Sequence, residues 1–211
     1  MKYIVIPVTF FQTNCYILWC TKTLYTAIID PGGDIYKIIN IINKYNLYIK
    51  LILITHGHLD HIGAAYNLSI KYNIPICGPH KYDIVWIKNI KLQTIYFSLY
   101  NCIFKYNQWL SHKQKISLGN ILINIYHCPG HTPGHLIFYI KEHHVLISGD
   151  IIFKNSIGRT DLPFSNYTHL MKSIKNSILT LNQNTIILPG HGQNTTLLKE
   201  IKYNKFISKI I

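Results

Sequence analysis

The spacing of apolar residues along the chain predicts strands and helices in alternation. Short apolar runs and period-two patterns predict strands, whereas apolar residues three or four apart predict helices. The predicted strands cover residues 3–8, 14–20, 24–29, 50–54, 121–127, 135–140, 144–149 and 184–188. The predicted helices cover residues 35–42, 61–72, 80–89, 165–180 and 195–206. The later half of segment 79–113 is expected to be strand-like, and 150–163 a long loop.

The order of these elements predicts an α+β fold of two packed sheets with helices outside, a four-layer αβ/βα sandwich. Strands dominate each half of the chain, and each half closes with a strand followed by a helix. A chain of 211 residues is long enough to bury a sizeable core. Because no linker, repeat or low-complexity tract interrupts it, we expect one domain over residues 1–211.

Composition narrows the class of protein further. Hydrophobic residues make up 48% of the chain and charged residues 14%, which argues against general disorder. No apolar stretch reaches the roughly 18 residues of a membrane-spanning helix. The apolar run after Lys2 is interrupted by Pro7 and lacks a cleavage site, so it predicts a first strand rather than a signal peptide. The five cysteines form no C-x-x-C pair, which favours a reducing cytoplasm. They are Cys15, Cys20, Cys77, Cys102 and Cys128.

A net charge of +13 fits two explanations. Such a charge is typical of proteins with polyanionic partners. A genome with A/T-rich codons would also produce a chain rich in Lys, Ile, Asn and Tyr. Only one basic residue is arginine, Arg159, and no basic motif is interleaved with aromatic residues. Codon bias is therefore favoured, and we expect no specific nucleic-acid partner and no membrane partner.

The segment from Thr55 to His61 contains four side chains of metal-ligand type within six residues. It follows the apolar run 50–54 and precedes a predicted helix. Residues two apart in an extended segment point the same way, so His56 and His58 can share one metal ion. Asp60 and His61 lie where the chain turns into the helix and can face a second ion. Without a bound cation this polar cluster would be costly to bury.

Three further candidate ligands stand on glycine-containing loops at or near the ends of predicted strands. His131 lies within segment 128–135, Asp150 ends the strand at 144–149, and His191 follows the strand at 184–188. Loops at strand ends commonly carry catalytic groups. Each motif alone is weak evidence, but together with the first one they predict a metal site.

The order and spacing of these residues resemble the ligand set of the metallo-β-lactamase superfamily along nearly the whole chain. Within it, Ile-Asp-Pro-Gly-Gly at 29–33, Gly-Arg-Thr-Asp-Leu-Pro at 158–163 and Pro-Gly-His-Gly at 189–192 resemble the short glyoxalase II-like hydrolases of bacteria. The tail 199–206 is similar to their C-terminal end. Longer glyoxalase II enzymes carry a C-terminal helical domain that helps to bind glutathione, and no such separate domain is expected here.

The resemblance implies a role for each candidate ligand. His56, His58 and His131 would hold a first metal, and Asp60, His61 and His191 a second. Asp150 would bridge the two ions, and Asp60 and Asp150 are the expected catalytic carboxylates. Two divalent ions activate water and stabilise the oxyanion that develops during hydrolysis. Zinc is expected, although this ligand set also suits iron or manganese.

The implied activity is hydrolysis of a small-molecule glutathione thioester, S-D-lactoylglutathione, to D-lactate and glutathione. The rival is a persulfide dioxygenase of the same fold with a single iron; a β-lactamase, a nuclease and a non-enzymatic binding module are less favoured. Arg159 is a candidate substrate contact, because a guanidinium grips carboxylates with two parallel hydrogen bonds. A clamp between Arg159 and Asp161 is slightly preferred. His135 is expected to support the site rather than to bind metal.

Overall fold

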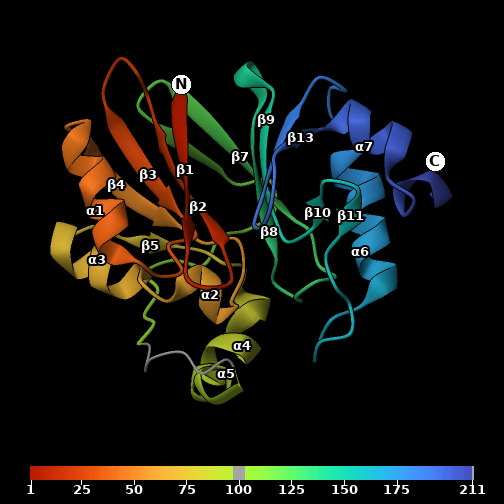
Figure 1. Cartoon of the computed structure of the whole chain (residues 1–211), viewed down its shortest axis with the longest axis horizontal. Coiled ribbons are helices and arrows are strands. Elements are labelled where there is room, and N and C mark those ends of the chain that lie inside the picture. Colours follow the sequence, from red (N-terminus) through yellow and green to blue (C-terminus); the bar gives the residue numbers. More distant parts are fainter. Residues whose placement is uncertain (97–102, 211) are drawn as a thin grey trace.

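The computed structural model describes residues 1–96 and 103–210, and these residues form four layers. Figure 1 shows two twisted sheets side by side, with one group of helices outside the first sheet and another outside the second. The α+β four-layer sandwich expected from the sequence is confirmed.

The first sheet has the strand order β1-β2-β3-β4-β5. β1, β2 and β3 are antiparallel neighbours, whereas β3, β4 and β5 run parallel. The strands are β1 (Lys2–Val8), β2 (Thr13–Trp19), β3 (Tyr25–Ile29), β4 (Tyr48–Leu53) and β5 (Ile76–Cys77). Helices α1 (Ile35–Lys44) and α3 (Ala65–Tyr72) cover its outer face.

The second sheet has the strand order β13-β12-β9-β8-β7-β6. Only β12 and β9 are parallel neighbours within it. The strands are β6 (Lys115–Leu118), β7 (Ile121–His127), β8 (Leu136–Ile140), β9 (Val145–Gly149), β12 (Ile186–Pro189) and β13 (Thr195–Thr196). Its outer face is covered by α6 (Tyr167–Ser173), which continues as a π-helical turn (Ile174–Ile178), and by α7 (Leu197–Tyr203).

Shorter elements connect the sheets and surround their shared edge. The helices are α2 (Leu59–Ile62), α4 (Ile84–Lys88) and α5 (Ile90–Tyr96). A small hairpin consists of β10 (Ile152–Phe153) and β11 (Ser156–Ile157). Single 3-10 turns occupy Lys81–Asp83, Lys141–His143 and Ile207–Lys209.

Alternating side chains of the central strands fill two different cores. Leu51 and Leu53 of β4 pack between the two sheets, whereas Ile52 packs under the helices of the first layer. In the second sheet Phe138 faces the inter-sheet core, and Ile137 faces α6 and its π-helical turn. Both faces of these strands are buried, which explains why they read as nearly continuous apolar runs in the sequence.

Several predicted boundaries differ from the structure. The helix predicted at 61–72 is divided into α2 and α3, and β5 was not predicted. The loop at 150–163 contains the β10–β11 hairpin, and the helix predicted from 195 begins at Leu197, after β13.

Ile90–Tyr96 form α5, so the helical part of segment 79–113 extends beyond the helix predicted at 80–89. The strand-like prediction for the later half is wrong where the structure describes it. Residues 103–113 contain no strand beyond a single bridge at Gln108, and 97–102 lie outside the described residues. The Ile, Thr and Tyr residues of this segment have strand propensity, but tertiary contacts override it. Gln93, on α5, is buried against the loop that follows β4.

The structure bears on the expectations about membrane-spanning helices and about the cysteines. Among the described residues no helix is long and apolar enough to cross a membrane. The cysteines in the described part of the chain are buried free thiols: Cys15, Cys20, Cys77 and Cys128. Cys102 lies outside the described residues.

Gly32 permits the close approach of the β3–α1 turn to α2. A Cβ at Gly32 would collide with the carbonyl oxygen of Asp60. We expect Gly32→Ala to lower the free energy of unfolding by at least about 3 kcal/mol, because backbone on both sides would have to move. Gly192→Ala is the control: Gly192 has φ +75° but nothing within 4 Å of the added Cβ. It should cost only about 1–2 kcal/mol of left-handed strain. Equal losses in denaturant titrations of the two variants would contradict this explanation.

Candidate metal centre

The seven candidate ligands meet at the edge where strands of both sheets end. His56, His58, Asp60 and His61 follow β4 and lead into α2, while His131 lies on the loop between β7 and β8. Asp150 follows β9, and His191 follows β12. β9 and β12 are parallel neighbours, so their ends bring Asp150 and His191 together. In Figure 1 this edge lies between α2 and the ends of the strands of the second sheet that point toward α2.

Three imidazoles form the first cluster. His58 Nδ1 lies 3.0 Å from His56 Nε2 and 3.1 Å from His131 Nε2. Ligand atoms about 2.0–2.2 Å from one metal ion are separated by roughly 3–3.6 Å. The three nitrogens therefore have the spacing of ligands to a single ion, and all three side chains are buried.

A second cluster lies beside the first. His61 Nε2 lies 3.5 Å and His191 Nε2 3.3 Å from Asp60 Oδ2. Thr13 donates a hydrogen bond of 2.8 Å from its hydroxyl to the same oxygen, which fixes the carboxylate. This arrangement has two nitrogens and one oxygen that can bind a divalent cation.

Asp150 lies between the two clusters. Its Oδ2 is 3.5 Å from both His131 Nε2 and His191 Nε2, and its Oδ1 is 3.5 Å from His61 Nε2. One carboxylate thus reaches both clusters. Asp150 Oδ1 and His61 Nε2 are buried and have no hydrogen-bond partner in the described structure. Buried polar atoms without partners are costly, and cations bound at this site would satisfy them.

Hydrogen bonds on the outer side fix four of the five histidines. In each, Nδ1 lies 2.9–3.1 Å from an oxygen outside the cluster. The pairs are His56 with Thr55 Oγ1, His61 with Asp30 Oδ2, His131 with the Arg159 carbonyl, and His191 with the Phe11 carbonyl. Carbonyl and carboxylate oxygens accept only, and the Thr55 hydroxyl already donates to Asp30, so Nδ1 carries the proton. Nε2 then presents its lone pair to the centre.

Burial and charge give the two clusters different electrostatics. Burial lowers the pKa of His56 and His58 well below the usual range, so both are neutral, as metal ligands must be. Burial acts in the same direction on His61, but the carboxylates of Asp60, Asp150 and Asp30 outweigh it and raise its pKa to about 10. A divalent cation at this cluster would balance the same carboxylates and bind His61 in its neutral form, with Nε2 free of a proton.

Asp30 links the first sheet to the second cluster. Its side chain is 1% exposed, and it accepts hydrogen bonds from the Thr55 amide (2.8 Å), the Thr55 hydroxyl (2.6 Å) and His61 Nδ1 (3.0 Å). Asp30 appears in the sequence as part of a turn motif, but its role as the partner of His61 was not predicted.

Asp83 is a second supporting carboxylate that the sequence did not reveal. It is fully buried and accepts hydrogen bonds from the Gly57 amide, the Thr132 hydroxyl and the Gly134 amide. Burial raises its pKa to about 7, although the three donors oppose that rise. Asp83 thereby joins the loop that carries His58 to the loop that carries His131.

The loop after β4 is also held by α4 and α5. Gln93 accepts a hydrogen bond from the Leu59 amide (3.0 Å) and donates to the carbonyls of Gly57 (3.2 Å) and Trp86 (3.0 Å). The Trp86 ring meets the His58 ring edge to face, with 4.4 Å between the ring centroids. α5, which lies beyond the helix predicted at 80–89, therefore forms one wall of the centre together with α4.

His135 lies beside the first cluster but is not part of it. Its ring stacks on His56, with centroids 4.7 Å apart, and its Nε2 accepts a hydrogen bond of 3.0 Å from the Asp150 amide. Its position is that of a support for Asp150.

Arg159 and Asp161 form a two-pronged ion pair at the surface. Nε and Nη2 of Arg159 each lie 2.8 Å from an oxygen of Asp161, and both side chains are largely exposed. The Arg159 carbonyl is the group that fixes His131, so this pair stabilises the loop directly beside a candidate ligand.

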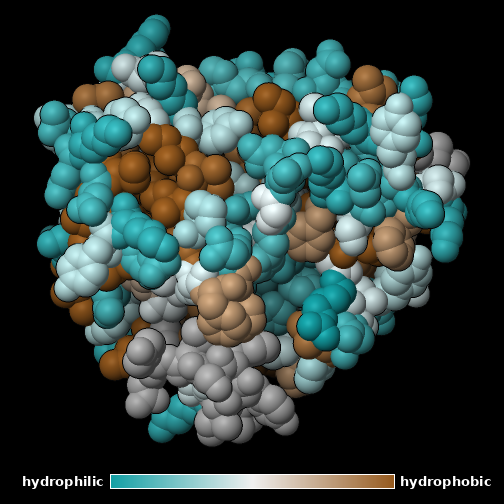
Figure 2. All heavy atoms as spheres, in the orientation of Figure 1, coloured by the Kyte–Doolittle hydropathy of each residue, from teal (hydrophilic) through white to brown (hydrophobic). Residues whose placement is uncertain are grey.

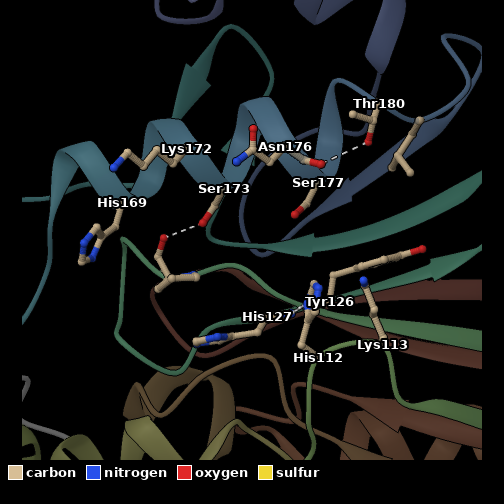
Figure 3. Close-up of a pocket in the computed structure, with 12 residues that line it drawn as sticks. His112, Lys113, Tyr126, His127, His169, Lys172, Ser173, Asn176, Ser177 and Thr180 are labelled. Atoms are coloured by element: carbon tan, nitrogen blue, oxygen red, sulfur yellow. Dashed lines mark hydrogen bonds between the residues drawn. The ribbon is translucent and has the colours of Figure 1, made fainter.

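The remaining histidines lie outside the two clusters. His112, His127 and His169 line a separate cavity of about 560 Å³ with Lys113 and Lys172, between β7 and α6 (Figure 3). His80 stacks on His127, at 4.0 Å between ring centroids. In the part of the chain that the structure describes, no group of possible metal ligands includes any of them, nor His143 or His144.

The chain is similar to several known proteins over nearly its whole length. The family model described as the metallo-beta-lactamase superfamily matches residues 8–191. The protein named hydroxyacylglutathione hydrolase GloC of Haemophilus influenzae is 39% identical over 206 residues, which cover 97% of each chain. The crystal structure of the BLEG-1 B3 metallo-beta-lactamase is 33% identical with a TM-score of 0.91, over 98% of this chain and 100% of that one. TTHA1623, solved in a di-iron-bound form, is 30% identical with a TM-score of 0.86, over 96% and 99%.

We predict that Asp83 controls metal affinity through the two loops it joins. Asp83→Asn places an amide NH2 opposite at least one N–H or O–H donor. The free energy of unfolding should fall by about 2–3 kcal/mol, and metal affinity at least about tenfold. Metal-chelator competition and denaturant unfolding measure the two effects. Asp34→Asn, which makes the same substitution at an exposed carboxylate paired with Lys37, is the matched control. Unchanged metal affinity in Asp83→Asn would show that the loops hold their positions without it.

Proposed function

The chain belongs to the metallo-β-lactamase superfamily, and we propose that it is a cytoplasmic thioester hydrolase acting on S-D-lactoylglutathione. It is a hydroxyacylglutathione hydrolase-like metallohydrolase, with His/Asp clusters typical of a binuclear centre of this superfamily. The observation that carries the substrate proposal is the 39% identity to the Haemophilus influenzae enzyme over 97% of both chains. We also propose that residues 1–211 form one domain of this fold.

We propose that His56, His58 and His131 hold one metal ion and that Asp60, His61 and His191 hold the other. Asp150 would bridge them, since its two oxygens face both clusters. We take these divalent ions to be zinc, with iron or manganese as alternatives. When bound, they would supply the chemistry of two-metal hydrolases, which is activation of water and polarisation of the thioester carbonyl.

The protein itself contributes by orienting the histidine ligands and holding them in place. The outer hydrogen bonds hold the Nε2 lone pairs of four histidines toward the centre. These side chains therefore need little rearrangement to bind metal ions. Cys128, the thiol nearest in sequence to the centre, is not a suitable nucleophile. It is fully buried, and burial raises its pKa to about 12. Attack by water therefore fits this site better than a covalent thiol mechanism.

Turnover of S-D-lactoylglutathione by the purified protein, with its metals counted by elemental analysis, tests the proposal. We expect release of D-lactate and glutathione and about two metal ions per chain. Removal of metal by a chelator should abolish turnover, and added divalent metal should restore it. A single tightly bound iron, with oxygen consumed in the presence of a persulfide, would instead identify the rival dioxygenase.

A second candidate activity is β-lactam hydrolysis, favoured by the similarity to the BLEG-1 B3 metallo-beta-lactamase. The discriminating measurement is kcat/KM for a chromogenic cephalosporin on the same preparation. A larger kcat/KM for the cephalosporin than for the thioester would reverse our order of the two activities.

Arg159→Lys tests whether the ion pair with Asp161 supports catalysis. Lysine is a point charge and cannot reproduce the two parallel hydrogen bonds, so the loop whose carbonyl fixes His131 should loosen. We expect kcat to fall by about tenfold while both metals stay bound, with a small decrease in melting temperature. A higher KM with unchanged kcat would assign the guanidinium to a substrate carboxylate, and wild-type behaviour would show that the residue is incidental.

A further inference from the structure

We propose that a lysine-lined cavity next to His191 binds a carboxylate of the glutathione part of the substrate, an inference that rests on the proposed function. The cavity, here called the lysine cavity, has a volume of about 600 Å³. The residues that carry the argument are Lys154, Lys199, Lys205 and the buried Glu200. They come from the β10–β11 turn, from α7 and from the segment after α7.

The lysine cavity adjoins the metal centre. The ring of Phe153, directly before Lys154, lies 6.3 Å from the ring of His191, measured between centroids. Lys154 Nζ donates a hydrogen bond of 2.6 Å to Gln193, two residues beyond His191. Figure 1 shows the β10–β11 hairpin and α7 near β13, the edge strand of the second sheet.

The reach of the substrate matches this placement. Thr195, which also lines the lysine cavity, is four residues after His191, so their Cα atoms are at most about 14 Å apart. Glutathione has the length of a tripeptide, about 10 Å when extended, and its carboxylates are at the two ends. The thioester is on the central residue, so each carboxylate reaches roughly 7–9 Å from it. A thioester group held at the metal centre can therefore direct one carboxylate toward the lysine cavity, whose lysines have long, flexible side chains.

Among the residues that the structure describes, no acidic side chain forms an ion pair with the three lysines of the lysine cavity. Within residues 1–96 and 103–210, the ion pairs made by lysine or arginine are Lys37–Asp34 and Arg159–Asp161. Glu200 is the acidic residue of the lysine cavity, but its oxygens are used by other donors. They accept from the Asn155 amide, the Thr195 hydroxyl and the Asn204 side-chain amide, at 2.6–2.8 Å.

Glu200 also makes the lysine cavity rigid. A fully buried carboxylate is costly unless hydrogen bonds compensate for lost hydration. Here the compensating donors lie on the β10–β11 turn, on β13 and just after α7, so one side chain joins three segments. Asn204 adds a hydrogen bond of 3.0 Å to the Ser156 carbonyl. The lysines therefore project from a fixed frame rather than from independent loops.

A second basic cavity offers a matched control. It lies between β7 and α6, and Figure 3 shows Lys113 and Lys172 on its opposite walls. Neither lysine has an acidic partner among the described residues. No ring contact or side-chain hydrogen bond in the described structure joins this cavity's lysines to His191 or Gln193. Replacing this pair removes the same charge without touching the lysine cavity.

The experiment compares two double variants, Lys199→Gln with Lys205→Gln, and Lys113→Gln with Lys172→Gln. In the first, KM for S-D-lactoylglutathione should rise about fivefold or more at low salt, with kcat within about twofold of wild type. The second should keep both constants within about twofold. Because exposed charges are screened by salt, the difference in KM should shrink as ionic strength rises. Equal KM changes in the two double variants would overturn the inference and leave the proposed function intact.

Binding of S-methylglutathione gives a readout that does not need turnover. This thioether keeps both carboxylates and cannot be hydrolysed. By calorimetry, the metal-containing wild-type protein should bind it, and the Lys199/Lys205 variant should bind it about fivefold or more weakly. The control variant should bind it like wild type. Failure of wild type to turn over lactoylglutathione would refute the proposed function. Failure of wild type to bind S-methylglutathione, or equal binding by all three proteins, would refute the carboxylate site.

Discussion

Asp30 accepts three hydrogen bonds at the point where two neighbouring strands of the first sheet end. Two come from Thr55, after β4, and the third from the His61 imidazole. Because the carboxylate is buried, losing any of these donors would leave charge without compensation, so the strand ends and the imidazole are fixed together. Thr55 in turn accepts from His56, which extends the same constraint to the first cluster. The geometry of both clusters thus depends on one desolvated carboxylate behind them.

The same device recurs elsewhere in the molecule. Asp83 joins the loops of His58 and His131, and Glu200 joins three segments beside His191. With Asp60 and Asp150 at the centre, five of the eight acidic residues are used inside the structure. Asp34, Glu142 and Asp161 are left at the surface. We attribute the predominance of lysine among the basic residues to codon bias. The use of the acids inside the structure explains why so few of those lysines are neutralised.

Residues that stand in short sequence motifs could be predicted from the sequence. Residues whose role depends on partners far away in the sequence could not. The ligand candidates stand in short motifs after apolar runs, so local spacing was enough to identify them. Asp83 lies 26 residues from Gly57 and 51 from Gly134, its main-chain partners, and nothing around it in the sequence marks it. Similarly, α5 has strand-type composition, and its helical state is tied to contacts of Gln93 with a loop more than 30 residues away.

Two of the groups that orient the histidines could not be predicted from the sequence for a different reason, because they are main-chain carbonyls. His131 and His191 are fixed by the main-chain carbonyls of Arg159 and Phe11, and any residue supplies a carbonyl. The side chain of a residue that supplies such a carbonyl acts only through the path of its loop. The ion pair between Arg159 and Asp161 is an example. The main-chain contacts of His131 and His191 therefore do not require a particular side chain at positions 159 and 11, whereas Asp30 and Asp83 act through their carboxylates. Substrate choice within this fold is then set by the surrounding walls and cavities, where side-chain identity is not constrained by the ligands.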